Sequence, residues 1–204
     1  MNEQEVFWSS DIGEVYRIDN DGFASDIGVA AWDEMLSKIG KGDLQSYLEC
    51  GSNIGRNVGL LHSLIPSATA NVVEINSESL QICRDRWNIS SYYLGSISTA
   101  QFSQKFDLVF SCGVLIHVNP EDLVASMKSM FELSSRYVLI AEYFNREPVS
   151  ITYRGAEQKL FKRDFGKLFL ENFNANLVDC GFLWSYIYEQ GGFDDVTFWL
   201  FEKN

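Results

Sequence analysis

The chain has 204 residues, of which 46% are hydrophobic and 14% aromatic, and its formal net charge is −12 at pH 7. This length and composition fit one folded domain with a full core and exclude an intrinsically disordered chain. The acidic balance argues against nucleic acid as a partner. No run approaches the roughly 20 apolar residues of a membrane span.

The start of the chain and its cysteines fit a cytoplasmic protein. The first residues (MNEQE) are acidic and lack the basic start of a signal peptide. The four cysteines form no C-x-x-C pair, so we expect free, buried thiols in a reducing compartment. With only two histidines, the sequence predicts no metal site.

Residues 1–40 are expected to form an N-terminal helical cap, with one segment around Phe7 and Trp8 and another over about residues 23–39. Residues 41–204 alternate between short β-rich runs and helical patterns, which is typical of a mainly parallel sheet with helices on both faces. The expected strands are 45–50, 71–76, 90–95, 106–112 and 136–143, and the expected helices are 54–65, 77–87, 119–134 and 165–172.

Capping residues mark the beginning of two of these helices. Asn119 and Pro120 form a cap and a first helical position, and Asp164 can cap the helix at 165–172. Residues 177–188 and 195–202 are expected to be two strands joined by residues 189–192 (EQGG), a hairpin signal. The seven-stranded sheet therefore ends with an antiparallel strand.

Residues 49–55 (ECGSNIG) lie where the first expected strand gives way to a helix. Glycines at 51 and 55 permit positive φ, and the first N–H groups of the helix offer donors to a ligand. Glu49 disfavours a phosphate but can accept hydrogen bonds from a cationic or hydroxylated group. The pattern therefore indicates a nucleoside that carries an amino acid rather than a pyrophosphate.

Segments with similar features follow the next three strands, where open α/β sheets place their ligands. Glu74 ends the second strand, about one βαβ length beyond the glycine loop, and its carboxylate can accept from both ribose hydroxyls. Residues 95–97 (GSI) follow the third strand, and residues 113–118 (GVLIHV) follow the fourth. We expect the four segments to meet at one edge of the sheet.

In this arrangement the chain resembles the class I S-adenosylmethionine-dependent methyltransferases, whose Rossmann-like sheet ends in the same antiparallel hairpin. Residues 48–55, 73–76, 113–120 and 153–165 are also similar to the methylases associated with pseudaminic acid biosynthesis, a group tied to bacterial nonulosonic-acid sugar pathways. The resemblance implies O- or N-methylation of a small, sugar-derived acid, with S-adenosyl-L-methionine as cofactor and no metal.

The resemblance also implies roles for individual residues. The expected cofactor-binding residues are Glu49, Gly51, Ser52, Asn53, Gly55, Glu74, Ile75, Ser96, Ile97, Cys112, Gly113 and Val114. The expected substrate-binding residues are Trp8, Tyr16, His117, Tyr143, Asn145, Tyr153, Arg154 and Arg163. If the acceptor needs a general base, the candidates are His117, Glu142 and Asp164.

The chain departs from the group's pattern at two places. Asp19 stands where the group has an arginine, which puts the same acidic substrate in doubt. The loop 96–105 contains no Asp or Glu, although many relatives use an acid there to accept from the adenine amino group. Ser96 or a backbone carbonyl is a substitute for that acid.

Other functions remain open at this stage. A methyltransferase could act on another carboxylate or on a peptide, with residues 153–163 contacting it. A non-catalytic regulator could retain the fold and bind the cofactor without turnover. A nicotinamide-dependent enzyme is disfavoured because the turn is not G-x-G-x-x-G. The sequence does not indicate an oligomeric state.

Overall fold

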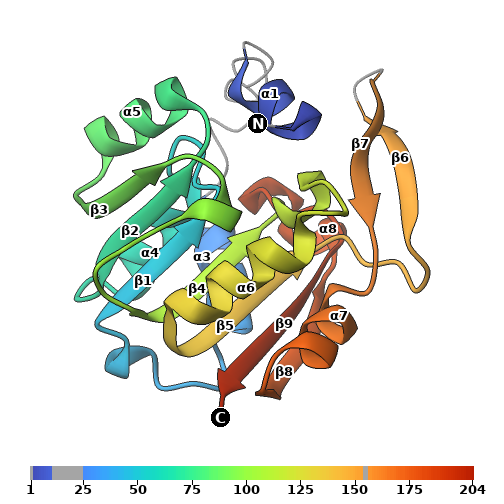
Figure 1. Cartoon of the computed structure of the whole chain (residues 1–204). Coiled ribbons are helices and arrows are strands. Elements are labelled where there is room, and N and C mark those ends of the chain that lie inside the picture. Colours follow the sequence, from blue (N-terminus) through green and yellow to red (C-terminus); the bar gives the residue numbers. More distant parts are fainter. Residues whose placement is uncertain (1, 11–24, 154–155) are drawn as a thin grey trace.

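The computed structural model describes residues 2–10, 25–153 and 156–204, except for the side chains of residues 153 and 156–159 (Figure 1). The main sheet consists of β1 (Ser46–Cys50), β2 (Thr69–Glu74), β3 (Ile89–Leu94), β4 (Phe106–Cys112), β5 (Ser134–Glu142), β8 (Ala175–Leu183) and β9 (Val196–Lys203). Their order is β3-β2-β1-β4-β5-β9-β8. Neighbours from β3 to β5 are parallel, and β9 is antiparallel to both β5 and β8. The expected seven-stranded sheet with one antiparallel strand is confirmed.

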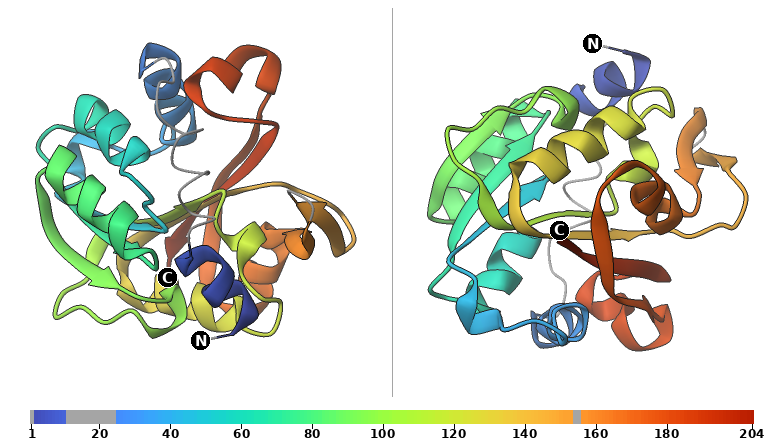
Figure 2. Two further views of the ribbon diagram at one scale, coloured as in Figure 1. Left: turned by 90° about the horizontal axis from the view of Figure 1, so that it is seen from above. Right: turned by 60° about the horizontal axis from the view of Figure 1, so that its bottom comes forward.

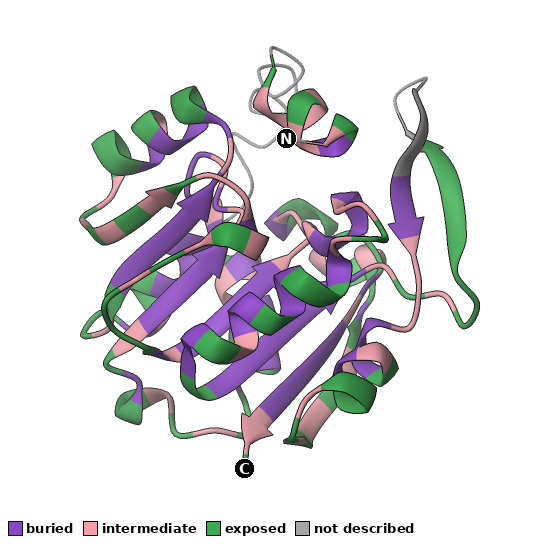
Figure 3. Ribbon diagram, in the orientation of Figure 1, coloured by how far each residue is buried: buried purple, intermediate pink, exposed green. Residues whose placement is uncertain are grey.

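Helices cover both faces of this sheet because successive strand residues point to opposite sides. On one face, α3 (Ser25–Met35), α4 (Arg56–Leu64) and α5 (Ser77–Arg86) share a core with Tyr47 and Phe110. On the other face, α6 (Leu123–Leu133) and α7 (Phe165–Asn172) share a core with Leu48 and Val109. The inner strands β1, β2, β4, β5 and β9 are accordingly mostly buried, while the edge strands β3 and β8 and the outer faces of the helices are largely exposed or partly exposed (Figure 3).

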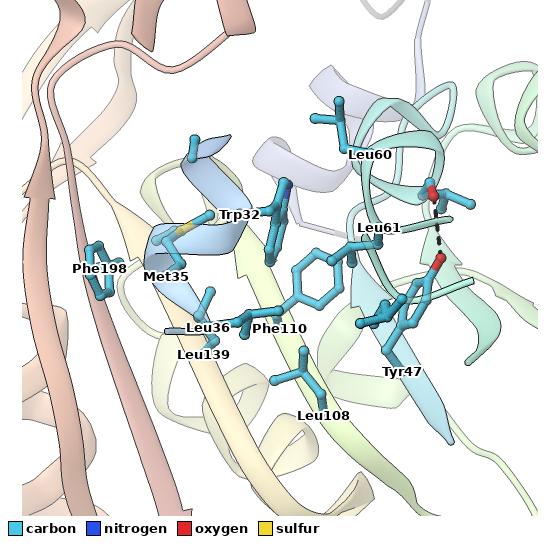
Figure 4. Packing of buried hydrophobic residues seen from close by; sticks show 14 of the residues in the cluster. Trp32, Met35, Leu36, Tyr47, Leu60, Leu61, Leu108, Phe110, Leu139 and Phe198 are labelled. Carbon is cyan, nitrogen blue, oxygen red and sulfur yellow. Dashed lines mark hydrogen bonds between the residues drawn. The ribbon is translucent and has the colours of Figure 1, made fainter. Parts of the chain in front are cut away.

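Trp32 on α3 anchors the first of these cores (Figure 4). Its side chain is fully buried, and its ring centroid lies 4.7 Å from that of Phe110 in an edge-to-face arrangement. Its indole N–H donates to Asn57 Oδ1 at 3.3 Å. The segment expected as part of an N-terminal cap therefore packs into the core of the sheet domain.

Two elements lie above the carboxyl ends of the parallel strands. Helix α1 (Glu3–Ser9) is close to the start of α6 in both views from different sides (Figures 1 and 2), and Asn2 Nδ2 donates to Asp122 Oδ2 at 2.6 Å. A separate antiparallel hairpin of β6 (Val149–Tyr153) and β7 (Ala156–Lys162) projects from the same end. The sequence did not predict this hairpin.

Several boundaries differ from the expected ones for identifiable reasons. Helix α6 begins at Leu123, because Asn119 Oδ1 accepts from the backbone N–H of Glu121 and holds residues 119–122 in a turn. The expected strand 177–188 ends at Leu183. It is followed by the short helices α8 (Ser185–Tyr188) and η4 (Glu189–Gly191), and η4 includes most of the segment expected as a tight hairpin.

The cysteines are free, as expected, but they are not all buried. Cys50 and Cys83 are buried, Cys112 is partly buried, and Cys180 on the edge strand β8 is exposed.

Within the described part of the chain, no helix is long and apolar enough to cross a membrane.

The packing of Trp32 makes a stability prediction. Trp32→Ala removes a buried indole and leaves Asn57 without its donor, so the free energy of unfolding should fall by about 3–5 kcal/mol. Trp184→Ala is the control, because Trp184 is 51% exposed and should cost less than about 1 kcal/mol. Urea unfolding followed by circular dichroism measures both. Equal losses for the two variants would contradict the assigned core.

Candidate active site

A pocket of about 160 Å³ lies at the carboxyl ends of β1, β2 and β4, beneath α1. Four segments meet in it, as the sequence predicted: the glycine loop, the ends of β2 and β3, and the turn after β4. Of the expected cofactor-binding residues, all except Gly55 line it. A Cβ on Gly55 would lie 2.6 Å from Trp87 and 2.7 Å from Cys83 Sγ, so this glycine lets α4 pack closely on α5.

The glycine loop is tied to β2 and to the turn after β4. The backbone N–H groups of Gly51 and Ser52 both donate to the carbonyl of Val73, at 2.8 and 3.1 Å. Gly51 has φ of 85°, and a Cβ there would lie 2.6 Å from the side chain of Val114. A larger residue is therefore excluded both by the backbone conformation and by the packing of Val114.

Glu74 closes the pocket at the end of β2 and organises the segments around it. Its carboxylate accepts from the backbone N–H of Asn53 at 2.6 Å, of Ile75 at 2.9 Å and of Asn76 at 2.8 Å. Burial raises the pKa of this carboxyl group, while the three donors favour its charged form. A carboxylate has about four lone-pair sites, so it can still accept from a ligand hydroxyl.

Glu49, at the end of β1, lines the pocket and has one buried oxygen without a hydrogen-bond partner among the described residues. Its side chain is 1% exposed, Oε1 accepts from Asn57 Nδ2 at 2.7 Å, and Oε2 has no partner among the described residues. Burial raises the pKa of Glu49 to about 8. A buried acceptor of this kind fits a ligand that brings an N–H or ammonium donor.

The turn after β4 forms the opposite wall of the pocket. Gly113, with φ of 67°, would carry a Cβ into open space, so the backbone itself faces the pocket there. His117 ends the short helix η3 (Leu115–His117) and is 9% exposed. Its ring centroid lies 4.3 Å from that of Trp8 on α1. Both rings line the pocket.

The other two candidate bases are not in the lining. Glu142 is fully buried at the end of β5, and its carboxylate accepts from Ser111 and from three backbone N–H groups of the turn after β4. These bonds occupy its lone pairs, so we correct its role from base to anchor. Asp164 caps α7 by accepting from the backbone N–H of Lys167 at 2.9 Å. The expected cap is confirmed, and the role of base loses its support.

Three expected substrate residues gather at the base of the β6–β7 hairpin instead of in the pocket. The hydroxyl of Tyr143 donates to Asp194 at 3.4 Å, and Lys162 Nζ lies 4.8 Å from the centre of the Tyr143 ring. The backbone N–H of Asn145 donates to the carbonyl of Arg163 at 3.3 Å. Tyr16, Asp19 and Arg154 lie outside the described residues, as does the side chain of Tyr153.

Some residues of the lining were missed at the level of sequence. Arg56, the first residue of α4, donates to the carbonyl of Gly192 at 2.9 Å and is a cation beside Glu49. The position of Arg56 directly after Gly55 in the sequence was the signal that could have identified it as a lining residue. Asn76 caps α5 by accepting from the N–H of Ser79, and Asn2, Gln4 and Glu5 come from α1. Trp8 of the expected N-terminal cap was predicted to contact the substrate, but no signal singled out these three residues.

Comparisons with known proteins agree with this geometry. Residues 48–136 match the family described as "Methyltransferase domain". The comparison with curated proteins found no match. The residues that match this family run from β1 to the beginning of β5 and so include the glycine loop, Glu74 and the turn after β4.

Solved structures with the same fold cover nearly the whole chain. Magnesium protoporphyrin IX methyltransferase from Synechocystis PCC 6803, with bound S-adenosylmethionine, is 12% identical with a TM-score of 0.70, and the match covers 100% of this chain and 99% of that one. The 1,6-didemethyltoxoflavin-N1-methyltransferase of Burkholderia thailandensis is 14% identical with a TM-score of 0.71, covering 98% and 87%. A S-adenosylmethionine-dependent methyltransferase from Clostridium acetobutylicum is 13% identical with a TM-score of 0.62, covering 98% and 96%.

These findings define the fold of the protein. Its fold is the Rossmann-like fold of the class I S-adenosylmethionine-dependent methyltransferases. Within it, residues 48–136 match the model of a methyltransferase domain. The matched range contains all residues of the pocket lining except Asn2, Gln4, Glu5 and Trp8.

The raised pKa of Glu49 predicts a pH dependence of stability. A carboxyl group with a pKa of about 8 in the folded protein and an ordinary value of 4.5 binds more protons when folded between these two values. Its contribution therefore makes the free energy of unfolding fall as pH rises through this window, by at most about 1.4 kcal/mol per pH unit. Glu49→Gln should remove this part of the slope.

Chemical unfolding at several values between pH 5 and 8 measures the slope. Glu171→Gln on the exposed surface of α7 is the matched control and should keep the wild-type slope. If Glu49→Gln and the wild type show the same slope, the buried carboxyl group does not titrate as assigned.

Proposed function

We propose that this protein transfers a methyl group from S-adenosylmethionine to a small-molecule acceptor. The observation that carries the proposal is the pocket, in which a glycine loop, the engaged carboxylate of Glu74 and the buried free oxygen of Glu49 converge. The set fits a ligand with ribose hydroxyls at one end and an ammonium group at the other. When bound, the cofactor supplies a methyl group that its sulfonium already activates.

Each part of the pocket has a task in this reaction. Glu74 accepts from the ribose hydroxyls, Glu49 accepts from the ammonium group, and residues 95–97 contact the adenine ring of the cofactor. Gly113 and Val114 form the wall beside the reacting centre. The protein then has to orient the acceptor and exclude water, and α1 covers the pocket in a position suited to that.

His117 is the proposed general base where the acceptor is a hydroxyl or an ammonium group. Of the three candidates, it is the one whose ring lines the pocket. Its contact with Trp8 holds the imidazole ring in place. Asp122, just before α6, lines the same pocket. An acceptor between Trp8 and His117 would have both an apolar surface and a proton acceptor.

As the finer proposal, the acceptor is a sugar-derived acid of the nonulosonic type. This rests on the resemblance of residues 48–55, 73–76, 113–120 and 153–165 to the pseudaminic acid-associated methylases. The described lining contains four carboxylates, on Glu5, Glu49, Glu74 and Asp122, against the cation Arg56. An acidic acceptor therefore depends on Arg56 and on the basic residues of 153–163 to bind its carboxylate.

Cofactor binding is tested by calorimetry with S-adenosylhomocysteine. The wild type should bind it, and Glu74→Gln should weaken binding about tenfold or more, because one oxygen becomes a donor facing the loop and the ribose. Glu171→Gln should leave the affinity unchanged. If the wild type shows no binding, or if Glu74→Gln binds as tightly as the wild type, the proposed cofactor site is wrong.

Turnover is tested with methyl-labelled S-adenosylmethionine and a panel of acceptors that contains a nonulosonic acid, its amide, an amine and a phenol. With a hydroxyl acceptor, His117→Asn should lower kcat by about 10²-fold or more and change S-adenosylhomocysteine affinity by less than about threefold. His62→Asn is the control, because His62 is exposed on α4. Binding without turnover of any acceptor would instead support the non-catalytic regulator.

A further inference from the structure

One buried carboxylate organises the wall of the pocket without lining it. Glu142 Oε1 accepts from Ser111 Oγ at 3.1 Å, from the backbone N–H of Val114 at 3.0 Å and from that of Leu115 at 2.9 Å. Oε2 accepts from the backbone N–H of Ile116 at 3.4 Å. Three consecutive backbone donors of one turn thus converge on a single side chain from the next strand of the sheet.

Burial of the Glu142 carboxylate costs free energy, and its hydrogen bonds offset that cost. The side chain of Glu142 is fully buried, and burial raises its pKa to about 7. Hydrogen bonds from four donors offset the cost of burying the charge, and bonds to an ionised acceptor are about twice as strong as neutral ones. Three consecutive backbone N–H groups of the turn thus find their acceptor in Glu142, so the conformation of the turn depends on this side chain.

The turn held in this way contacts both functional halves of the pocket. The side chain of Val114 packs on Gly51, where an added Cβ would approach it to 2.6 Å, so the turn confines the glycine loop. His117, at the other end of the turn, lies against Trp8 of α1. Movement of the turn would displace the cofactor side and the acceptor side together.

We propose that Glu142 is a positioning residue: its carboxylate holds the turn Val114 to His117 and thereby fixes Val114 against the glycine loop and His117 against Trp8. The proposal rests on the proposed function for its catalytic meaning. The hydrogen bonds themselves join groups of the chain to one another. Glu142 acts here on other groups and does not touch the acceptor.

Glu142→Gln is the informative variant. Its amide oxygen can keep the three bonds made by Oε1, although without the negative charge, whereas its NH₂ group would face the N–H of Ile116. Ser111→Ala is the matched control. It removes the one donor that does not belong to the turn and leaves the carboxylate and all three backbone bonds in place.

Two-dimensional NMR of both variants, with Trp8→Phe to identify the Trp8 indole signal, reports on the turn and on α1. In Glu142→Gln we expect shifted amide signals for residues 114–116, a shifted Trp8 indole signal, and S-adenosylhomocysteine affinity about tenfold weaker. Ser111→Ala should keep the Trp8 signal in place and the affinity within about twofold of the wild type.

An unshifted Trp8 signal in folded Glu142→Gln, with affinity equal to that of Ser111→Ala, would overturn the proposal. If Glu142→Gln does not fold, Glu142→Asp decides by the same measurements, because it keeps the charge but is one methylene too short to reach the whole turn. If the wild type does not bind S-adenosylhomocysteine, the proposed function fails. The Trp8 and amide signals then still decide whether Glu142 positions the turn.

Discussion

Backbone N–H groups that converge on buried carboxylates hold the functional edge of this sheet together. Glu74 collects the donors of Asn53, Ile75 and Asn76, and so joins the glycine loop to the end of β2. Glu142 collects the donors of the turn after β4. Loops at strand ends leave such donors without partners, and a carboxylate on the neighbouring segment satisfies several at once. These hydrogen bonds fix the loops that line the pocket.

Much of this could be predicted from the sequence because the relevant signals are local. The alternation of β-rich and helical segments predicted the sheet, and the glycine loop with Glu74 predicted the edge of the sheet at which the pocket lies. The β6–β7 hairpin was not predictable in this way, since its strands pair only with each other and show no clear alternation. Residues 185–191 form two short helices that were not predicted, because the pair Gly191 and Gly192 is also typical of hairpins.

The candidate bases show where local reasoning ends. Glu142 is the last residue of a strand and Asp164 directly precedes a helix, which are positions where catalytic carboxylates often lie. In the structure, however, Glu142 anchors a turn and Asp164 caps a helix. Only tertiary contacts distinguish these tasks, because hydrogen-bond partners come from distant segments. His117 was the candidate that reached the pocket, and its partner Trp8 comes from a helix more than 100 positions earlier in the chain.

A crystal structure of the protein with S-adenosylhomocysteine would test the central claim most directly. The account predicts the ligand in the pocket beneath α1, with ribose hydroxyls within hydrogen-bond distance of Glu74 and the ammonium group beside Glu49 Oε2. The turn after β4 should keep its bonds to Glu142. A ligand bound elsewhere, or bound with Glu74 and Glu49 both out of contact, would contradict it.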